Sequence, residues 1–247
     1  MQPTSVLDPA TLPIRQGLAR ERERAWQCLA RAGTWWSAAD RLAIAAETRN
    51  AHSCALCGRR KAALSPYGAG GAHSNLGQLS TPMLEVVHRI ATDAGRLTRK
   101  WLVSMLATGV TEEQYVETIG VIATIIALDT FDLALGLPQR ALPPPRPGAP
   151  GRHRPAGARR DLAWVHTVAP ELLAPEDPDP YSVHGTKNIH RALSLVPQEV
   201  LNFFDLDVEL YLKDHEIRDF TREFRALTHA QIELLAGRVS SLNGCYY

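Results

Sequence analysis

Two cysteine segments hold the residues best suited to chemistry. Residues 52–57 read His-Ser-Cys-Ala-Leu-Cys and contain a complete Cys-x-x-Cys pair. Near the other end of the chain, Glu233 lies 12 residues before Cys245, which follows Asn-Gly and precedes two tyrosines. A thiolate is the nucleophilic form of cysteine, and two thiols at this spacing can form and break a disulfide. The pattern indicates thiol chemistry on a helical unit that occurs twice.

The repeat extends to the helix before each cysteine. Ser37 lies 17 residues before Cys54, and Thr228 lies 17 residues before Cys245. Each is a helix N-cap type followed three positions later by Asp or Gln, as in a capping box, and an apolar run follows. Cap, helix, break and cysteine therefore recur 191 residues apart, which favours an internal duplication.

The segment from Glu233 to Cys245, with its Leu-Asn-Gly-Cys-Tyr-Tyr end, resembles the alkylhydroperoxidase D-like group of the carboxymuconolactone decarboxylase superfamily. The motif of that family is a glutamate, 12 residues to a cysteine, then x-x-Cys and x-x-x-His. Residues 111–138 also resemble the long second helix of its fold. The resemblance covers 35–138 as one complete unit and 181–247 as the first part of a second. It implies an all-α, duplicated helical bundle.

The resemblance also implies a peroxidase activity. In the family the second cysteine is peroxidatic, the first resolves it as a disulfide, and the glutamate, the histidine and the residue two after the first cysteine relay protons. In the second unit, Glu233, Cys245 and Tyr247 match the glutamate, the resolving cysteine and the relay tyrosine. The peroxidatic cysteine and the histidine would follow Tyr247, so we expect the chain to be truncated inside the motif.

The first unit has both cysteines, Cys54 and Cys57, but lacks the relay of the family. The three relay positions are occupied by Leu42, Leu56 and Lys61. Glu47 is one expected substitute, because it precedes Cys54 by seven residues and would share its face if the helix continues for two turns. The charges of Arg59, Arg60 and Lys61 are expected to stabilise a thiolate. His52 is a candidate base.

Other functions compete with this hypothesis. The same cysteines with His52 and His73 offer two thiolates and two imidazoles, which suit zinc, although the two-residue step from His52 to Cys54 is unusual for zinc fingers. The chain could also be a non-catalytic redox sensor or a structural family member. Decarboxylase or lactone chemistry, which needs no cysteine pair, is a further alternative.

Composition limits the partners. The 247-residue chain has a net charge of +1, which argues against a general nucleic-acid or acidic-membrane partner. Its most apolar stretch, 119–128, is too short to span a bilayer, and no signal peptide is recognisable. Four cysteines do not suggest a secreted disulfide scaffold, so we expect a reducing cytoplasm. The expected partners are a hydroperoxide, a dithiol or thioredoxin-like reductant and further copies of the chain, with no cofactor.

Hydrophobic periodicity predicts helices and no strand. We divide the chain into an N-terminal helical extension (1–34), a first unit (35–138), a Pro/Arg-rich linker (139–180) and an incomplete second unit (181–247). The linker boundary follows the prolines, since 11 of the 17 fall within 138–180. The helix from 111 to 135 is apolar nearly all round and is expected at the centre of a bundle or at a subunit interface. Helices are predicted over 14–32, 38–51, 82–93, 96–108, 111–135, 186–196, 197–212, 214–226 and 229–241.

Several reactive side chains are expected to be structural. Cys28 lies on the first helix and is predicted to be an ordinary buried or half-buried thiol. His184 and His190 are predicted to be surface or capping residues. Asp129 and Asp132 lie three apart on the apolar helix and are expected to act as caps or to pair with arginines at a subunit contact.

Overall fold

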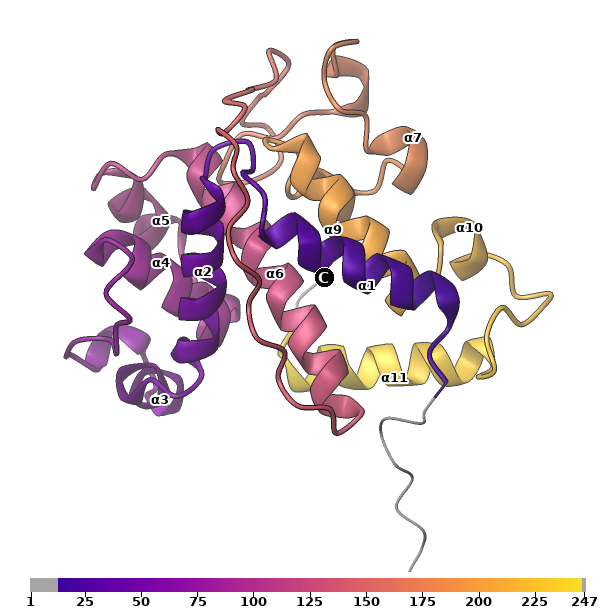
Figure 1. Ribbon diagram of the computed structural model, residues 1–247, viewed down its shortest axis with the longest axis horizontal. Coiled ribbons are helices and arrows are strands. Elements are labelled where there is room, and N and C mark those ends of the chain that lie inside the picture. Colours follow the sequence, from indigo (N-terminus) through magenta and orange to yellow (C-terminus); the bar gives the residue numbers. More distant parts are fainter. Residues whose placement is uncertain (1–12, 246–247) are drawn as a thin grey trace, which may run out of the picture.

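The computed structural model describes residues 13–245, and its regular structure is helical (Figure 1). The α-helices are α1 (Gln16–Leu29), α2 (Ala38–Ala51), α3 (Ala55–Ala62), α4 (Thr81–Asp93), α5 (Arg99–Leu106), α6 (Glu112–Ala134), α7 (Tyr181–His184), α8 (Asn188–Arg191), α9 (Pro197–Leu210), α10 (Asp214–Ile217) and α11 (His229–Leu242). Short 3₁₀ turns occur at η2 (Pro66–Gly68), η3 (Ala94–Arg96) and η4 (Pro170–Leu172). Within 13–245 the β-pairing is one isolated bridge, Arg159 to Thr167. The predicted all-α class is confirmed.

Helix α6 runs through the middle of the molecule and contacts α1, α2, α4 and α9 (Figure 1). It begins at a capping box, in which Thr111 accepts from the Gln114 amide and the Gln114 side chain accepts from the Thr111 amide. It ends before Gly136, whose φ of 68° lies in the left-handed region that terminates helices. Its predicted place at the centre of a bundle is confirmed.

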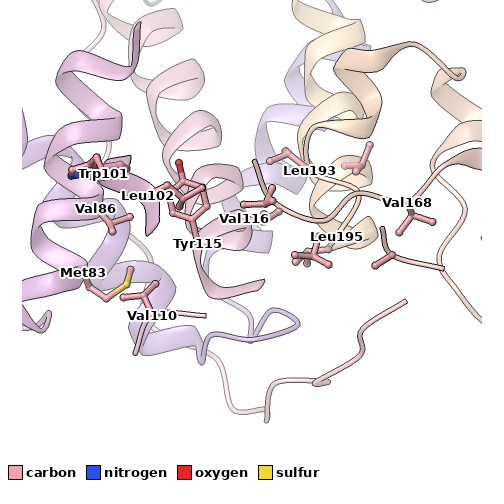
Figure 2. Close-up of a cluster of buried hydrophobic side chains, with 14 of the residues drawn as sticks. Met83, Val86, Trp101, Leu102, Val110, Tyr115, Val116, Val168, Leu193 and Leu195 are labelled. Carbon is pink, nitrogen blue, oxygen red and sulfur yellow. The ribbon is translucent and has the colours of Figure 1, made fainter. Parts of the chain in front are cut away.

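Two apolar clusters meet on α6. Figure 2 shows the first, in which Tyr115 and Val116 of α6 lie between side chains of α4 and α5 on one side and Leu193 and Leu195 on the other. The second cluster joins α1, α2, α4 and α9 to the later turns of α6, through residues such as Trp26 and Ile125. The two clusters position α2 and α4, which carry much of the site described below.

A buried ionic group ties α2, α6 and α9 together. Arg41 Nη1 donates to Glu117 Oε1 and to Glu199 Oε1, both at 2.7 Å. All three side chains are at most 2% exposed. Gly120 lies beside Glu199, and the absence of a Cβ there allows the close approach of α6 and α9. Burial disfavours the charged form of Glu117 and raises its pKa, although Arg41 opposes that shift.

The segment from 139 to 180 has little regular structure but packs on the helices. Its backbone donates to the loop between α1 and α2, from the Arg146 amide to Ala30 O and from the Arg152 amide to Thr34 O, each at 2.7 Å. Val165 and Val168 are buried in the first apolar cluster. The segment therefore contributes to the core, and its arginines pair with α1 and α6.

Two of the predicted helices are much shorter than expected. The helix predicted over 186–196 is only α8, and Pro197 starts a separate helix, α9, with the non-helical Val196 before it. The helix predicted over 214–226 ends at Ile217. There Asp219 accepts from the Thr221 amide at 2.9 Å, a local bond that competes with helix formation.

The reactive side chains expected to be structural give mixed outcomes. Cys28 is half-buried, as predicted. Arg49 binds Asp129 through two nitrogens at 2.8 and 2.7 Å, so the predicted arginine pairing of that residue is confirmed within one chain. The surface location predicted for His184 and His190 is wrong, because both rings are buried against Phe204. Their burial follows from the packing of the short helices α7 and α8 on α9, which sequence periodicity does not reveal.

Candidate functional site: a buried dithiol and dihistidine cluster

Helix α3 positions both cysteines of the Cys-x-x-Cys pair. Helix α2 ends at Ala51, a short turn follows, and Cys54 is the extended N-cap residue of α3. Cys57 lies in the first turn of that helix, so the two sulfurs occupy the same side of its N-terminus. The backbone amides there favour negative charge. Both residues are buried, with 3% and 4% of their surfaces exposed.

Two imidazole rings contact the sulfurs. His73 comes from the loop between α3 and α4, and its Nδ1 lies 3.6 Å from Cys54 Sγ and 3.5 Å from Cys57 Sγ. His88 comes from α4 and is fully buried, with its Nδ1 3.2 Å from Cys57 Sγ. The two sulfurs and the two Nδ1 atoms all lie within 4.8 Å of one another.

A carboxylate holds the far side of each ring. His73 Nε2 lies 2.8 Å from Glu85 Oε2, and Glu85 also binds Arg60 Nη1 at 2.8 Å. His88 Nε2 lies 2.9 Å from Glu47 Oε1. Each imidazole is thus fixed between a sulfur and a carboxylate, with Nδ1 directed at the thiols.

Glu47 is itself held in place. It is buried on α2 and accepts from Asn50 Nδ2 at 2.6 Å and from the Leu76 amide at 3.1 Å. Burial raises its pKa, but the bonds from His88, Asn50 and Leu76 lower it more, so the pKa lies below its usual value. The carboxylate is therefore ionised and orients the His88 ring.

The surroundings favour the thiolate form of both cysteines. Burial raises the pKa of the Cys54 thiol, but bonds from the backbone amides of Cys57 and Ser74 and from His73 lower it more, to about 5. The pKa of Cys57 is also lowered, because the contacts with His73 and His88 outweigh burial. The thiolate is the reactive form of cysteine, so both shifts favour thiol chemistry.

The rings shift in the opposite direction. Burial lowers the pKa of His73, but Cys57, Glu85 and Cys54 raise it more, to about 10. The pKa of His88 is raised for the same reason, by Cys57 and Glu47 against burial. The bonds from His73 and Arg60 hold the Glu85 pKa at about 2 despite burial. Each of these pKa shifts favours the charged form of its group, so the arrangement favours thiolate–imidazolium pairs backed by carboxylates.

Some of the predicted site residues meet in this cluster. Cys54 and Cys57 form its centre, and Glu47 joins it through His88. The continuing helix on which the two-turn spacing of Glu47 and Cys54 relied does not form, because α2 ends at Ala51 and Cys54 begins α3. His73, considered as a metal ligand, is also present. His52 is exposed and lies outside the group of four potential ligands, so its proposed role as base or ligand at this cluster is wrong.

Sequence reasoning missed His88 and Glu85. Both lie on α4 as a Glu-x-x-His pair, with the buried Val86 and Val87 between them. The signal was a carboxylate and an imidazole three residues apart within the apolar stretch of α4 from Met83 to Ile90, which places both on one face. A histidine on an apolar face is commonly a core residue, so the pattern alone did not reveal its role.

The second cysteine segment is different. The capping box at Thr228 forms, as does the one at Ser37. Glu233 is 44% exposed and contacts Tyr211 and His229, and Cys245 is exposed. Tyr247 lies outside the described residues. Helix α11 exposes leucines to solvent, whereas α2 packs between α4 and α6.

Comparison of the chain with protein-family models, with curated proteins and with solved structures finds no match. Between residues 13 and 245, no helix combines the length and the apolar character needed to cross a membrane. A functional assignment must therefore come from the chemistry of the cluster itself.

Proposed function

We propose that this protein is a thiol-dependent peroxidase that reduces hydroperoxides through a Cys54–Cys57 dithiol and disulfide cycle. The supporting observation is that both sulfurs share one buried cluster with two imidazoles, each held by a carboxylate. We further propose that the chain is an alkylhydroperoxidase-like helical bundle, with residues 35–138 as the working unit and 181–247 as its related second unit.

Cys57 is the proposed peroxidatic cysteine, because its sulfur contacts both imidazole rings, that of His73 and that of His88. Its thiolate attacks the terminal oxygen of the hydroperoxide, so an S–O bond forms and the O–O bond breaks. The departing alkoxide takes a proton from His88 and leaves as the alcohol. Glu47 then holds the neutral ring in place through Nε2, as a positioning residue.

Cys54 is the proposed resolving cysteine. Its thiolate attacks the Cys57 sulfenic acid, an S–S bond forms and the S–O bond breaks. The hydroxide that leaves takes a proton from His73, which touches both sulfurs, and departs as water. A low-pKa Cys54 is also a good leaving group when a reductant later attacks the disulfide.

A dithiol donor closes the cycle. The donor is oxidised to its own disulfide, both electrons pass to the Cys54–Cys57 disulfide, and its two protons restore the thiolate–imidazolium pairs. The donor thus has the chemistry of a small dithiol or of a thioredoxin-like protein. No bound cofactor takes part in any of these steps.

The deciding experiment is a thiol count on the reduced, metal-free chain before and after slightly more than one equivalent of hydrogen peroxide, with peptide mapping. We expect the loss of two thiols, mapped to a Cys54–Cys57 disulfide. In Cys54→Ser the Cys57 sulfenic acid should persist and react with dimedone, whereas Cys57→Ser should form neither product.

Cys28→Ser is the matched control, since that half-buried thiol lies on α1 next to Arg24 and outside the cluster. It should leave disulfide formation unchanged. Equal loss of oxidation in Cys28→Ser and Cys57→Ser, or slow oxidation spread over all thiols, would contradict the proposal.

A non-catalytic redox sensor is the second candidate, and the burial of both sulfurs favours it. The two functions differ in turnover. A peroxidase consumes many equivalents of peroxide with a dithiol donor present, whereas a sensor consumes about one equivalent and stays oxidised. Carboxymuconolactone decarboxylase-type chemistry would be independent of Cys57, so the activity of Cys57→Ser distinguishes it.

A further inference from the structure

We infer that Cys54, Cys57, His73 and His88, when reduced, form a tetrahedral binding site for Zn²⁺. The inference goes beyond the peroxidase proposal, because it concerns a second state of the same side chains. It rests on the positions of the four donor atoms and on the groups behind them.

The donor atoms already have the spacing of a zinc tetrahedron. Zinc lies about 2.3 Å from thiolate sulfur and about 2.0–2.1 Å from imidazole nitrogen, so the S···N edges of the tetrahedron are about 3.5 Å long. Three of the four S···N distances in the cluster are 3.6, 3.5 and 3.2 Å. All four donors lie within 4.8 Å of one another. An ion can therefore enter after only small side-chain adjustments.

The groups behind the rings are those that zinc sites use. A histidine that binds zinc usually donates its other ring N–H to a carboxylate, which fixes the tautomer and strengthens the ligand. Here both rings turn Nδ1 to the sulfurs and Nε2 to a carboxylate, Glu85 for His73 and Glu47 for His88. The Ser74 amide also donates to Cys54 Sγ at 3.4 Å, as amides do to metal-bound thiolates.

The donor set also selects the metal. Two thiolates and two imidazoles suit zinc, whereas Mg²⁺ and Ca²⁺ prefer oxygen ligands. Three of the four residues are buried and His73 is half-buried, and protein atoms would fill all four positions of the tetrahedron. Such closure is typical of structural or regulatory zinc rather than of catalytic zinc, which keeps one position for water.

Zinc and the disulfide exclude each other, because both need the same two sulfurs. The zinc-bound dithiolate reacts with one hydroperoxide and two protons to give the disulfide, free Zn²⁺, an alcohol and water. The sulfurs lose two electrons to the O–O bond, and the metal keeps its charge. Bound zinc therefore shields the dithiol, and oxidation releases the ion.

The test uses the full chain, reduced and stripped with a chelator, with Cys28→Ser and Cys245→Ser as background to remove the other two thiols. Zinc is titrated against a chromophoric chelator, and the retained metal is measured by mass spectrometry. Co²⁺ replaces zinc as a spectroscopic probe. We expect one zinc per chain, a thiolate-to-cobalt charge-transfer band and the intense visible bands of tetrahedral cobalt.

Variants locate the ligands. His73→Asn, in a loop, and Cys54→Ser should each weaken zinc binding at least a hundredfold and abolish the tetrahedral cobalt spectrum. His52→Asn is the matched control, an exposed neighbouring histidine that should change neither. Glu47→Gln should weaken binding by about 10–100-fold while the cobalt spectrum stays tetrahedral. Circular dichroism confirms that each variant is folded.

Retention of less than a tenth of an equivalent of zinc by the folded chain would overturn the inference. So would an affinity unchanged by Cys54→Ser and by His73→Asn. Zinc binding without a peroxide-driven disulfide in the metal-free chain would support the site and refute the peroxidase. A peroxide-driven disulfide without zinc binding would refute the zinc site and support the peroxidase.

Discussion

Gly120→Ala should destabilise the protein, although alanine is the better helix former. Gly120 is buried in α6, and a Cβ at this position would lie 2.6 Å from Glu199 Oε2 and 3.0 Å from Glu199 Cβ. Contacts this short require Glu199 to move. Its carboxylate would then withdraw from Arg41, to which it is bound at 2.7 Å.

The magnitude follows from three opposing terms. Overpacking a core costs about 1–3 kcal/mol. Loss of one partner of a buried ion pair costs about 3–5 kcal/mol when complete, and only part of it is lost here. The alanine gains about 1 kcal/mol of helix propensity. The net expectation is a loss of about 3 kcal/mol, which for a chain of this size lowers the melting temperature by roughly 6–12 °C.

Thermal and urea unfolding followed by circular dichroism measure this loss, and Gly58→Ala is the matched control. Gly58 is an exposed glycine within α3, and a Cβ there would meet no atom within 4 Å. It should leave stability unchanged or raise it by up to about 1 kcal/mol. The double variant Gly120→Ala/Glu199→Ala should lose less unfolding free energy than the sum of the losses of the two single variants. A Gly120→Ala protein as stable as the parent, or additive effects, would refute the proposed clash.

Three further predictions concern the core and the site. Arg41→Met should cost about 3–5 kcal/mol in urea unfolding, because it leaves two buried carboxylates without a cation; a loss below 1 kcal/mol would mean that they are not charged. Hydrogen peroxide should oxidise the cluster faster than cumene hydroperoxide in stopped-flow assays, because Cys57 is only 4% exposed; equal rates would indicate an open site. Glu47→Gln should slow disulfide formation at least tenfold, since His88 loses its ionised partner. The number of thiols finally oxidised should stay the same, and an unchanged rate would remove Glu47 from the mechanism.

The sequence predicted the fold best where both ends of a helix carried signals. The helix predicted over 38–51 matches α2, because Ser37 caps its start and the chain turns at His52. The helix α6 was found in the same way, from the Thr111 capping box and Gly136. Around 214–226 the apolar residues Ile217, Phe220 and Phe224 lie at helical spacing, but Phe220 is exposed, and a local bond at Asp219 competes with continuation of the helix.

The site was predictable only as far as local spacing reached. Cys54 and Cys57 lie on one turn of α3, so their meeting followed from local spacing. Glu47 lies on a different helix, α2, and reaches the cluster only through His88. His73 lies in a loop rich in glycine, and its position depends on the bond to Glu85 rather than on any repeat. His88 approaches the sulfurs because α4 packs on both α2 and α3, a tertiary contact that one sequence does not display.

The structure tests the expected duplication only at the N-terminal caps of the two corresponding helices, α2 and α11. Both capping boxes form, but α2 is buried on α4 and α6 whereas α11 exposes Leu234 and Val239. Two helices can share a start signal and still differ in packing, because a cap concerns only the first turn. The relation of the two units stays a prediction.

The cluster also changes which parts of the chain are cross-linked. A Cys54–Cys57 disulfide closes a loop of only a few residues, whereas a link from Cys57 to His88 spans 31 residues and joins α3 to α4. In the chain-entropy model, the longer loop restrains the unfolded chain by about 2 kcal/mol more. Exchange of a metal link for the disulfide would therefore loosen α4 against α3. The local stability of α4 would then depend on the oxidation state of the two sulfurs. Limited proteolysis or amide hydrogen exchange of α4 would detect that dependence.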